Sequence, residues 1–441
     1  MTRLPVVLAS FLVLALLLMA CETDVFGPDA STDEMITSAD KRGPTLDDSY
    51  VLPGAMIFDI AATPNGSILL GRVEFGELFF GPNTIKEIGR RGITEVTSIP
   101  TPPGSPVNGL APIGQRNFYA ASGGGDRTVG AGLWRASQGN ERLLADVSSF
   151  TLGSFDFTTG SGEPGPYPNA WKNQRCEPFV GPFSPGPQTN PYQIAAKNGG
   201  EVIVADAANN GVIRVRANGE IEVVAFMDPA VLPGDDPADP EDWMVLGEFD
   251  LGAFDWDDPE TFENLPGAFG IEYDLGADEI TCYVEPVPSA VAIGPDGSYY
   301  VGDLIGNTPQ NFAGEPSPPG LARIWRIEPG TTDARCPSSA CAQVEFDDDV
   351  ELNSVISLAF GPDGKLYVVD FDRNGAAAGF GIIPPGGGAL KQCDLESGMC
   401  DTILGEEETS LMFPGAITFD KQDNLWLLEN VFEPTVRQVS Y

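Results

Sequence analysis

The sequence contains no histidine in its 441 residues. Ser-His-Asp and Cys-His catalytic arrangements are therefore excluded, as is any metal site that needs an imidazole ligand. The GxSxG, P-loop and CxxCH motifs are also absent. Any catalysis would have to rest on carboxylates, tyrosine, lysine, arginine or a metal ion held by oxygen atoms.

Basic residues are scarce. The chain has 24 lysines and arginines against 64 aspartates and glutamates, for a net charge of −40. Only 7 of the bases are lysine, and no base of either kind occurs between Arg216 and Arg323. Phosphate groups repel such a charge distribution, so nucleic acids and anionic lipid surfaces are poor partners. Two interpretations stay open: the acidity serves a cation or a cationic partner, or it keeps the protein soluble in a salt-rich environment.

The chain also lacks an apolar run long enough for a typical membrane span, which needs roughly 20 residues. The longest run, LPVVLASFLVLALLLM (4–19), follows Arg3 and ends at Ala20-Cys21, an order typical of a secretory signal. The last residues of this segment, Leu-Met-Ala-Cys, resemble a bacterial lipobox. We therefore predict a signal peptide over 1–20, export, and lipidation at Cys21 that anchors the protein to the cell envelope. A plain secretory signal is the alternative.

Residues 21–48 are rich in acids and have no apolar period, which predicts a flexible tether before a folded body at 49–441. After Cys21 the number of cysteines is even, and an even number in an exported chain indicates disulfides. Four of these cysteines form two pairs that are close in the sequence, and each pair is a predicted disulfide. The other two cysteines lie in two long connections, which a third disulfide would join. Zinc is disfavoured because no CxxC motif is present. The six candidates are Cys176, Cys282, Cys336, Cys341, Cys393 and Cys400.

A ten-residue sequence motif is repeated in the predicted folded part of the chain. GPDGSYYVGD (294–303) and GPDGKLYVVD (361–370) each follow an apolar stretch. Pro-Asp-Gly is typical of a tight turn, and the β-rich residues after it predict a second strand. Four looser copies of this strand–turn–strand pattern occur at 55–72, 107–122, 191–206 and 414–430.

Most of these six units continue with two further strands, but the last one ends after TVRQVSY (435–441). SYVLPG (49–54) can supply the missing strand, so we predict an all-β, six-bladed β-propeller in which the two ends of the chain close one blade. A pair of β-sandwiches and a β-solenoid are the alternatives. The solenoid is disfavoured by the tight turns.

The combination of an apolar strand, GPDG and YV-D resembles the NHL-repeat propellers, and the order of motifs resembles the ScyD/ScyE family. This resemblance covers roughly residues 105–441. It implies a propeller of unsettled biochemical activity and brings no catalytic residues. The chain departs from the family in its acidic insert (228–279) and its hairpin cysteines. The matching stretches are 144–150, 190–215, 287–306, 318–327 and 358–370.

The long connections should all stand on one face of the propeller, because each joins strand ends that point the same way. They span 148–190, 228–286, 305–320 and 371–388. Long connections in a compact fold often carry function, so this face is the predicted binding surface. Residues at the nearby strand ends are its candidates, namely Asn190, Tyr192, Asp206, Asp303 and Asn353.

The sharpest chemical motif begins at Asp370 and runs DFDRNG, which matches the start of a calcium loop through Asp370, Asp372 and Asn374. The twelfth position is Gly381 rather than glutamate, and aspartate at a strand end also caps turns, so a purely structural role is the alternative. The acidic insert 228–279 is a second place where a hard cation would bind. Calcium is the only cofactor that the chain suggests.

We therefore expect a monomeric, exported and lipid-anchored propeller that binds an extracytoplasmic protein or a glycan through its face of long connections. The alternative is a calcium-dependent lactonase or related hydrolase with its site in the central channel. Such a site needs an oxygen-only cage drawn from several inner strands, and the sequence shows no clear set of four ligands.

Overall fold

The structure is a computed structural model. It describes residues 49–74, 83–154, 188–231, 283–305 and 319–440, apart from 91, 103, 115, 125–128, 138, 198–199, 229, 285, 348, 380, 382 and 406–410 within these ranges. The signal peptide and tether predicted over 1–48 lie outside the described residues, as do Cys176 and Cys282. The predictions made for these segments and cysteines, including lipidation at Cys21, therefore stay predictions.

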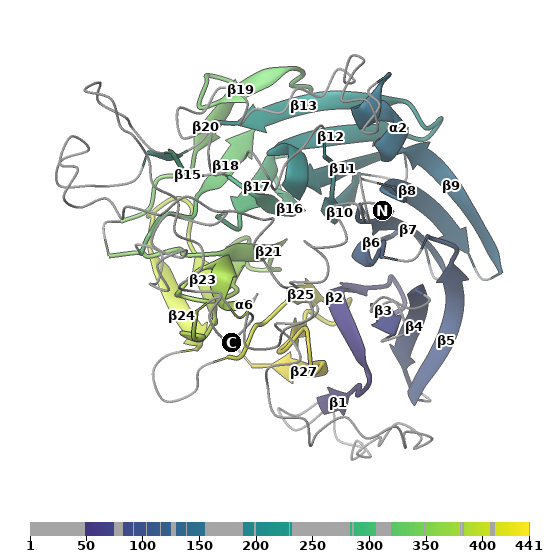
Figure 1. Ribbon diagram of the computed structural model, residues 1–441. Helices are drawn as coiled ribbons and strands as arrows, with labels where there is room; N and C mark the ends of the chain where they lie inside the picture. Colours follow the sequence, from purple (N-terminus) through teal and green to yellow (C-terminus); the bar gives the residue numbers. More distant parts are fainter. Residues whose placement is uncertain are drawn as a thin grey trace, which may run out of the picture.

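Six antiparallel sheets stand in a ring around a central axis (Figure 1), so the fold is a six-bladed β-propeller, as predicted. We number the blades along the chain and give their strands from the axis outward. Blade 1 holds β2 (Ala55–Ala62), β3 (Ile68–Glu74), β4 (Asn83–Gly89) and β5 (Gly92–Ile99). Blade 2 holds β6 (Val107–Pro112), β7 (Asn117–Ser122), β8 (Gly132–Ser137) and β9 (Asn140–Asp146). Blade 3 holds β10 (Pro191–Lys197), β11 (Glu201–Asp206), β12 (Gly211–Arg216) and β13 (Ile221–Met227).

The second half of the ring repeats this order. Blade 4 holds β16 (Pro288–Ile293), β17 (Tyr299–Asp303), β18 (Ile324–Ile327) and β20 (Cys341–Gln343). Blade 5 holds β21 (Val355–Phe360), β22 (Leu366–Asp370), β23 (Ala389–Cys393) and β24 (Cys400–Leu404). Blade 6 holds β25 (Ala416–Phe419), β26 (Leu425–Leu428), β27 (Thr435–Val439) and β1 (Ser49–Val51).

Blade 6 joins the two ends of the described chain. β1 pairs antiparallel with β27, with Ser49 opposite Arg437 and Val51 opposite Thr435. Leu52 follows β1, is 1% exposed and donates its backbone N–H to the carbonyl of Pro434 at 2.8 Å. The predicted closure of one blade by strands from both ends is therefore confirmed.

The repeated Pro-Asp-Gly phrase makes the turn between the two inner strands of blades 4 and 5. Gly297 and Gly364 both adopt φ of 81°, a value that favours glycine. Asp296 and Asp363 each accept the backbone N–H two residues further on. The local sequence of three or four residues therefore determines each turn, and the repeated motif forms the same hairpin in both blades.

Apolar side chains fill the spaces between neighbouring blades, where the strands present the alternate faces of their sheets. Several of the largest are fully buried there, including Trp325, Tyr119, Tyr299 and Tyr367. This packing gives separate hydrophobic clusters between neighbouring blades. It leaves two faces, one at the turns between first and second strands and the other at the longer connections.

One disulfide staples the outer hairpin of blade 5. Cys393 and Cys400 are bonded and lie directly opposite each other in β23 and β24. This confirms the expected hairpin bond.

The second disulfide joins Cys336 to Cys341 in a different setting. Cys336 ends β19 (Ala334–Cys336), which lies within the connection between β18 and β20 but pairs in parallel with β13 of blade 3. Cys341 begins β20 of blade 4. The pairing of the cysteines is as predicted, but the bond links strands of two blades rather than one hairpin.

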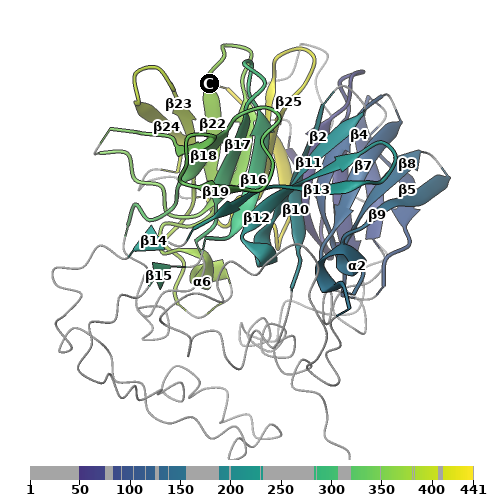
Figure 2. The same cartoon turned by 90° about the horizontal axis from the view of Figure 1, so that it is seen from above.

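The described ends of the long connections lie on one face (Figure 2). Helix α2 (Val147–Leu152), helix α6 (Ala376–Gly379) and the short strands β14 (Ala230–Val231) and β15 (Tyr283–Val284) all project on that side. The 3-10 turn η4 (Ala207–Asn209) follows β11 at the same end of blade 3. We call this side the insertion face and the other side the turn face.

β14 and β15 pair with each other, so the acidic segment between them leaves and rejoins the ring at a single point. No helix in the described ranges has the length and apolar character that a membrane crossing requires.

Candidate functional site

The predicted binding-face residues occupy equivalent places in three consecutive blades. Asp206, Asp303 and Asp370 each end the second strand of a blade, opposite Pro191, Pro288 and Val355 of the innermost strand. Asn190 and Tyr192 lie at the start of β10, and Asn353 lies just before β21. All of them therefore lie at the insertion-face end of their blades, in three separate blades, and their role in binding stays a prediction.

Asp206 is fully buried and fastens the start of blade 3. Its carboxylate accepts the backbone N–H of Asn190 at 2.7 Å and the hydroxyl of Thr189. Burial raises the pKa of Asp206 to about 6, although these hydrogen bonds oppose the shift. Its oxygens are committed to holding the chain that enters β10.

Asp370 repeats this arrangement in blade 5. Its carboxylate accepts the backbone N–H groups of Ser354 at 2.6 Å and of Asn353 at 3.1 Å, and Lys391 Nζ lies 3.8 Å away. Burial raises the pKa of Asp370, while the positive charge of Lys391 and the hydrogen bonds act in the opposite direction.

Asp303 is held by side chains instead. Trp325 donates its indole N–H to Asp303 Oδ2 at 3.0 Å, and Arg323 Nη2 lies 3.3 Å from the same oxygen. The Arg323 guanidinium also lies over the Trp325 ring, 4.8 Å from its centre. Burial raises the pKa of Asp303 to about 6 against the opposing charge of Arg323.

The predicted calcium loop runs from the end of β22 to helix α6, and its three candidate side chains bond to separate groups of the chain. Asp372 is fully buried, and its carboxylate accepts the backbone N–H groups of Asn374 at 2.8 Å and Gly387 at 3.0 Å, with Gly386 as a third donor. Asn374 donates its side-chain amide to the carbonyl of Pro384 at 3.0 Å.

These contacts are those of a loop held by an aspartate cap, the alternative that the sequence left open. Within the described ranges, no three acidic or sulfur side chains gather in a way that could hold a metal ion. A calcium ion at Asp372 would have to compete with three backbone donors, so calcium binding at this loop stays a prediction that calorimetric titration tests.

A feature of the axis was not foreseen from the sequence. In five of the six innermost strands the pairing register shifts near the start of the strand, which marks a β-bulge. Bulges re-aim side chains and are common beside functional sites. Each bulge carries or adjoins one buried polar residue: Asp59, Asn108, Gln193, Ser289 and Ser357.

These five side chains, together with Thr418 of β25, link every blade to the next by hydrogen bonds that we call the axial circuit. The linked pairs, in order round the ring, are Asp59 to Leu110, Asn108 to Pro191, Gln193 to Val291, Ser289 to Val355, Ser357 to Ile417 and Thr418 to Ala62. In each pair one partner is a side chain and the other is a backbone group of an innermost strand, so the circuit satisfies backbone groups on the axial edge of these strands, where no neighbouring strand pairs with them.

Gln193 reaches furthest across the axis and is 8% exposed. Its Oε1 accepts the backbone N–H groups of Val291 at 2.9 Å and Leu358 at 3.2 Å, and its Nε2 donates to Ser357 Oγ at 2.9 Å. One side chain of blade 3 is thus bonded to blades 4 and 5. The axis at this level is crossed by packed polar groups.

Asp59 is the titratable member of the axial circuit and is 3% exposed. It accepts the backbone N–H of Leu110 at 2.6 Å. Burial raises the pKa of Asp59 to about 8. The neighbouring Tyr192, whose ring lies 6.3 Å from that of Phe58, has a raised pKa because it is buried and because Asp59 carries charge.

A signal for the axial circuit exists in the sequence. Each bulged strand has a polar residue one or two positions before a buried aliphatic one, as in Asp59-Ile60, Gln193-Ile194 and Ser357-Leu358. The contacts that such a residue makes depend on which blades face each other, and no local pattern encodes that.

Comparisons with known proteins return structures alone. No family model matches the chain, and a search of curated proteins finds no match. A structural-genomics protein from Bacteroides thetaiotaomicron aligns over 87% of this chain and 69% of its own, with 12% identity and a TM-score of 0.44. Virginiamycin B lyase from Staphylococcus aureus aligns over 86% of this chain and 81% of its own, with 14% identity and a TM-score of 0.40.

A chain of a nidogen/laminin complex aligns over 85% of both chains, with 13% identity and a TM-score of 0.39. Identities of 12–14% and TM-scores of 0.39–0.44 carry no inference about activity, ligand or partner.

Proposed function

We propose that this protein is a non-enzymatic binding module that engages an extracytoplasmic protein through its insertion face. One observation carries the proposal: the described parts of three of the four long connections, those that contain α2, β14 with β15, and α6, lie on that face (Figure 2). Connections of this length in a compact fold are commonly functional.

Two further observations support binding rather than catalysis. The carboxylates nearest the insertion face, those of Asp206, Asp370 and Asp372, accept hydrogen bonds from the chain itself. At the axis, Gln193 and Ser357 bond across the inner strands, where a channel site of the hydrolase type would need free ligands. A binding role for the insertion face does not require these carboxylates, or the side chains of Gln193 and Ser357, to be available to a ligand.

The proposal includes export and a lipid anchor at Cys21, which rest on the amino-terminal sequence, and membership of the ScyD/ScyE family, which rests on the shared order of motifs. The net charge of −40 favours a partner with a basic surface. A glycan partner remains an outcome that the experiment below distinguishes.

Site-specific photocrosslinking in the native cell tests the binding role. A photoreactive amino acid replaces Pro319 or Glu433, which are exposed residues on the insertion face, or Lys421, an exposed residue at a blade 6 turn on the other face. We expect a protein adduct from the first two positions and none from Lys421. Deletion of residues 234–281 should abolish the adduct, while the melting temperature of the ring is retained.

Adducts of equal yield at all three positions would contradict a dedicated face. Loss of the adduct on enzymatic removal of glycans from the envelope fraction would identify a glycan partner instead.

A further inference from the structure

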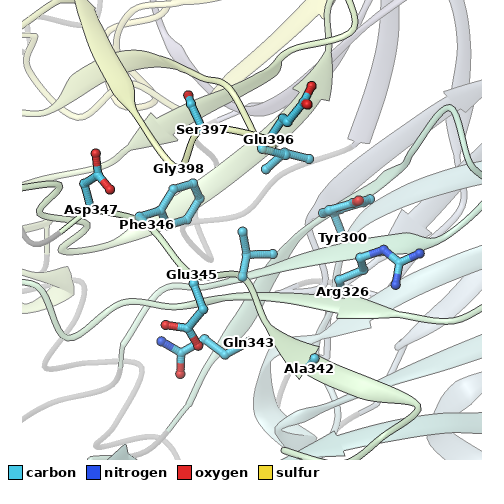
Figure 3. A pocket seen from close by; sticks show the side chains of 12 residues that line it. Tyr300, Arg326, Ala342, Gln343, Glu345, Phe346, Asp347, Glu396, Ser397 and Gly398 are labelled. Atoms are coloured by element: carbon cyan, nitrogen blue, oxygen red, sulfur yellow. The ribbon is translucent and has the colours of Figure 1, made fainter.

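A pocket of about 560 Å3 lies between blades 4 and 5, beside the turn that joins β23 and β24. One wall comes from β17, β18, β20 and the residues that follow β20, and the other from the turn between β23 and β24 (Figure 3). No candidate residue from the sequence lies in it.

The floor of the pocket is apolar. Tyr300 is 6% exposed, and its ring packs edge-on against Phe360 at 5.0 Å. Val344, Phe346 and Leu395 pack against the core between the two blades and also line the pocket. These side chains are only partly buried, so they offer apolar surface to an incoming group.

The rim is acidic. Glu345, Asp347 and Glu396 are exposed and line the pocket, and none of them takes part in an ion pair of the described residues. The one base in the lining, Arg326, is already engaged: its Nε and Nη2 donate to Asp296 Oδ2 at 3.2 and 2.7 Å. The pocket therefore presents negative charge beside an apolar floor.

The blade 5 wall is held rigidly by local bonds. Asp394 accepts the backbone N–H groups of Glu396 and Ser397, and the Cys393–Cys400 disulfide closes the base of the same turn. Asp347 donates its backbone N–H to the carbonyl of Gly398 at 3.0 Å and so joins the two walls. A wall fixed in advance reduces the entropy lost when a ligand binds.

We propose that this pocket binds an arginine or lysine side chain within a basic, partly apolar peptide segment of another protein. The aliphatic stem of such a side chain fits the floor at Phe346 and Leu395, and its cationic end meets the carboxylates of the rim. Long basic side chains bury their stems on apolar surface while the charge stays near water, and a cation gains further from an aromatic face. This site is separate from the insertion face and adds a second, charge-selective contact.

Fluorescence anisotropy with the purified full chain tests the proposal. The probe is a fluorescein-labelled peptide of sequence Ala-Arg-Leu-Arg-Ala, and the acidic Ala-Glu-Leu-Glu-Ala peptide is its counterpart. We expect saturable binding of the basic probe alone. The double substitution Glu345→Gln/Glu396→Gln should weaken it about tenfold or more, and Phe346→Ala about fivefold or more.

The matched control removes two exposed carboxylates elsewhere, with Glu95→Gln/Glu433→Gln. It lowers the total charge equally and should change the affinity by less than about twofold. Equal weakening by both double variants would show a general charge effect and overturn the proposal. An unchanged affinity of Phe346→Ala, with its melting temperature retained, would overturn the role of the apolar floor. Neither outcome bears on photocrosslinking at the insertion face.

Discussion

At the scale of single residues, the buried carboxylates make the ring sensitive to pH. Asp59 has a pKa of about 8 when folded, against an ordinary value of 3.8. The folded protein therefore keeps a proton that the unfolded chain has already lost, and its stability falls as pH rises through this window. The sign is opposite to that of a surface carboxylate in an ion pair.

Asp59→Asn should remove this dependence. We expect the free energy of unfolding of the variant to equal that of the original protein near pH 4. Near pH 9 it should be higher by at least about 1 kcal/mol, because no charge then forms at the axis. Asp206 and Asp303 also titrate, with pKa values of about 6, so Asp59 is reported by the difference in slope between Asp59→Asn and the original protein from about pH 6 to about pH 8. Melting temperatures measured across this interval check the prediction.

Asp394→Asn is the control, because the pKa of Asp394 lies below its usual value and the group is already ionised at pH 6. It should leave the slope between about pH 6 and about pH 8 unchanged. A steep slope that persists in Asp59→Asn would place the responsible proton elsewhere.

The places of Asp206, Asp303 and Asp370 at strand ends are predictable from the sequence because β-strands alternate and turns have a recognisable chemistry. Their partners are not predictable in this way, since they are backbone donors for Asp206 and Asp370 but tryptophan and arginine side chains for Asp303. Neither is the role of Gln193. The partners of Gln193 lie 98 to 165 positions away in the chain, and only ring closure brings them together.

At the scale of elements, the two described disulfides should differ in what they stabilise. Cys393–Cys400 closes one hairpin, whereas Cys336–Cys341 connects β19, paired with blade 3, to β20 of blade 4. Both close short loops, so each replacement by serine should cost about 2 kcal/mol through loop-closure entropy.

Hydrogen exchange separates the two bonds. In Cys336→Ser/Cys341→Ser we expect faster exchange in both β13 and β20, and also at Asp228, which follows β13 and donates its backbone N–H to the Cys336 carbonyl. In Cys393→Ser/Cys400→Ser the change should stay within β23 and β24. Faster exchange in one blade alone for the first variant would show that β19 does not couple the sheets.

The elements themselves were predictable to different degrees. The inner hairpins follow from local phrases such as Pro-Asp-Gly, and the closing strand follows from a missing fourth strand in the last unit. β19 was not predictable, because its three residues, Ala-Arg-Cys, lie in a connection and join the neighbouring sheet through tertiary contacts alone.

At the scale of the whole molecule, closure by β1 should control stability. A chain that begins at Pro53 loses β1 and the buried Leu52, which leaves β27 as an open edge. We expect a loss of about 3 kcal/mol or more relative to a chain that begins at Ser49, together with association at high concentration. Urea unfolding and light scattering measure both effects.

A synthetic peptide of residues 48–54 serves as the control for this truncation. Added in excess, it should raise the melting temperature of the chain that begins at Pro53 and leave the chain that begins at Ser49 unchanged. Equal stability of the two chains would show that β27 needs no partner.

The place of β1 also decides how the ring carries mechanical load. β1 is the outermost strand of blade 6 and only three residues long, so the described chain begins at the rim of the ring. Tension applied ahead of Ser49 falls first on the pairing between β1 and β27, which consists of three residue pairs, and its rupture would open the ring. Under tensile force applied at this end, β1 should therefore separate from β27 before any other strand pair of the ring opens.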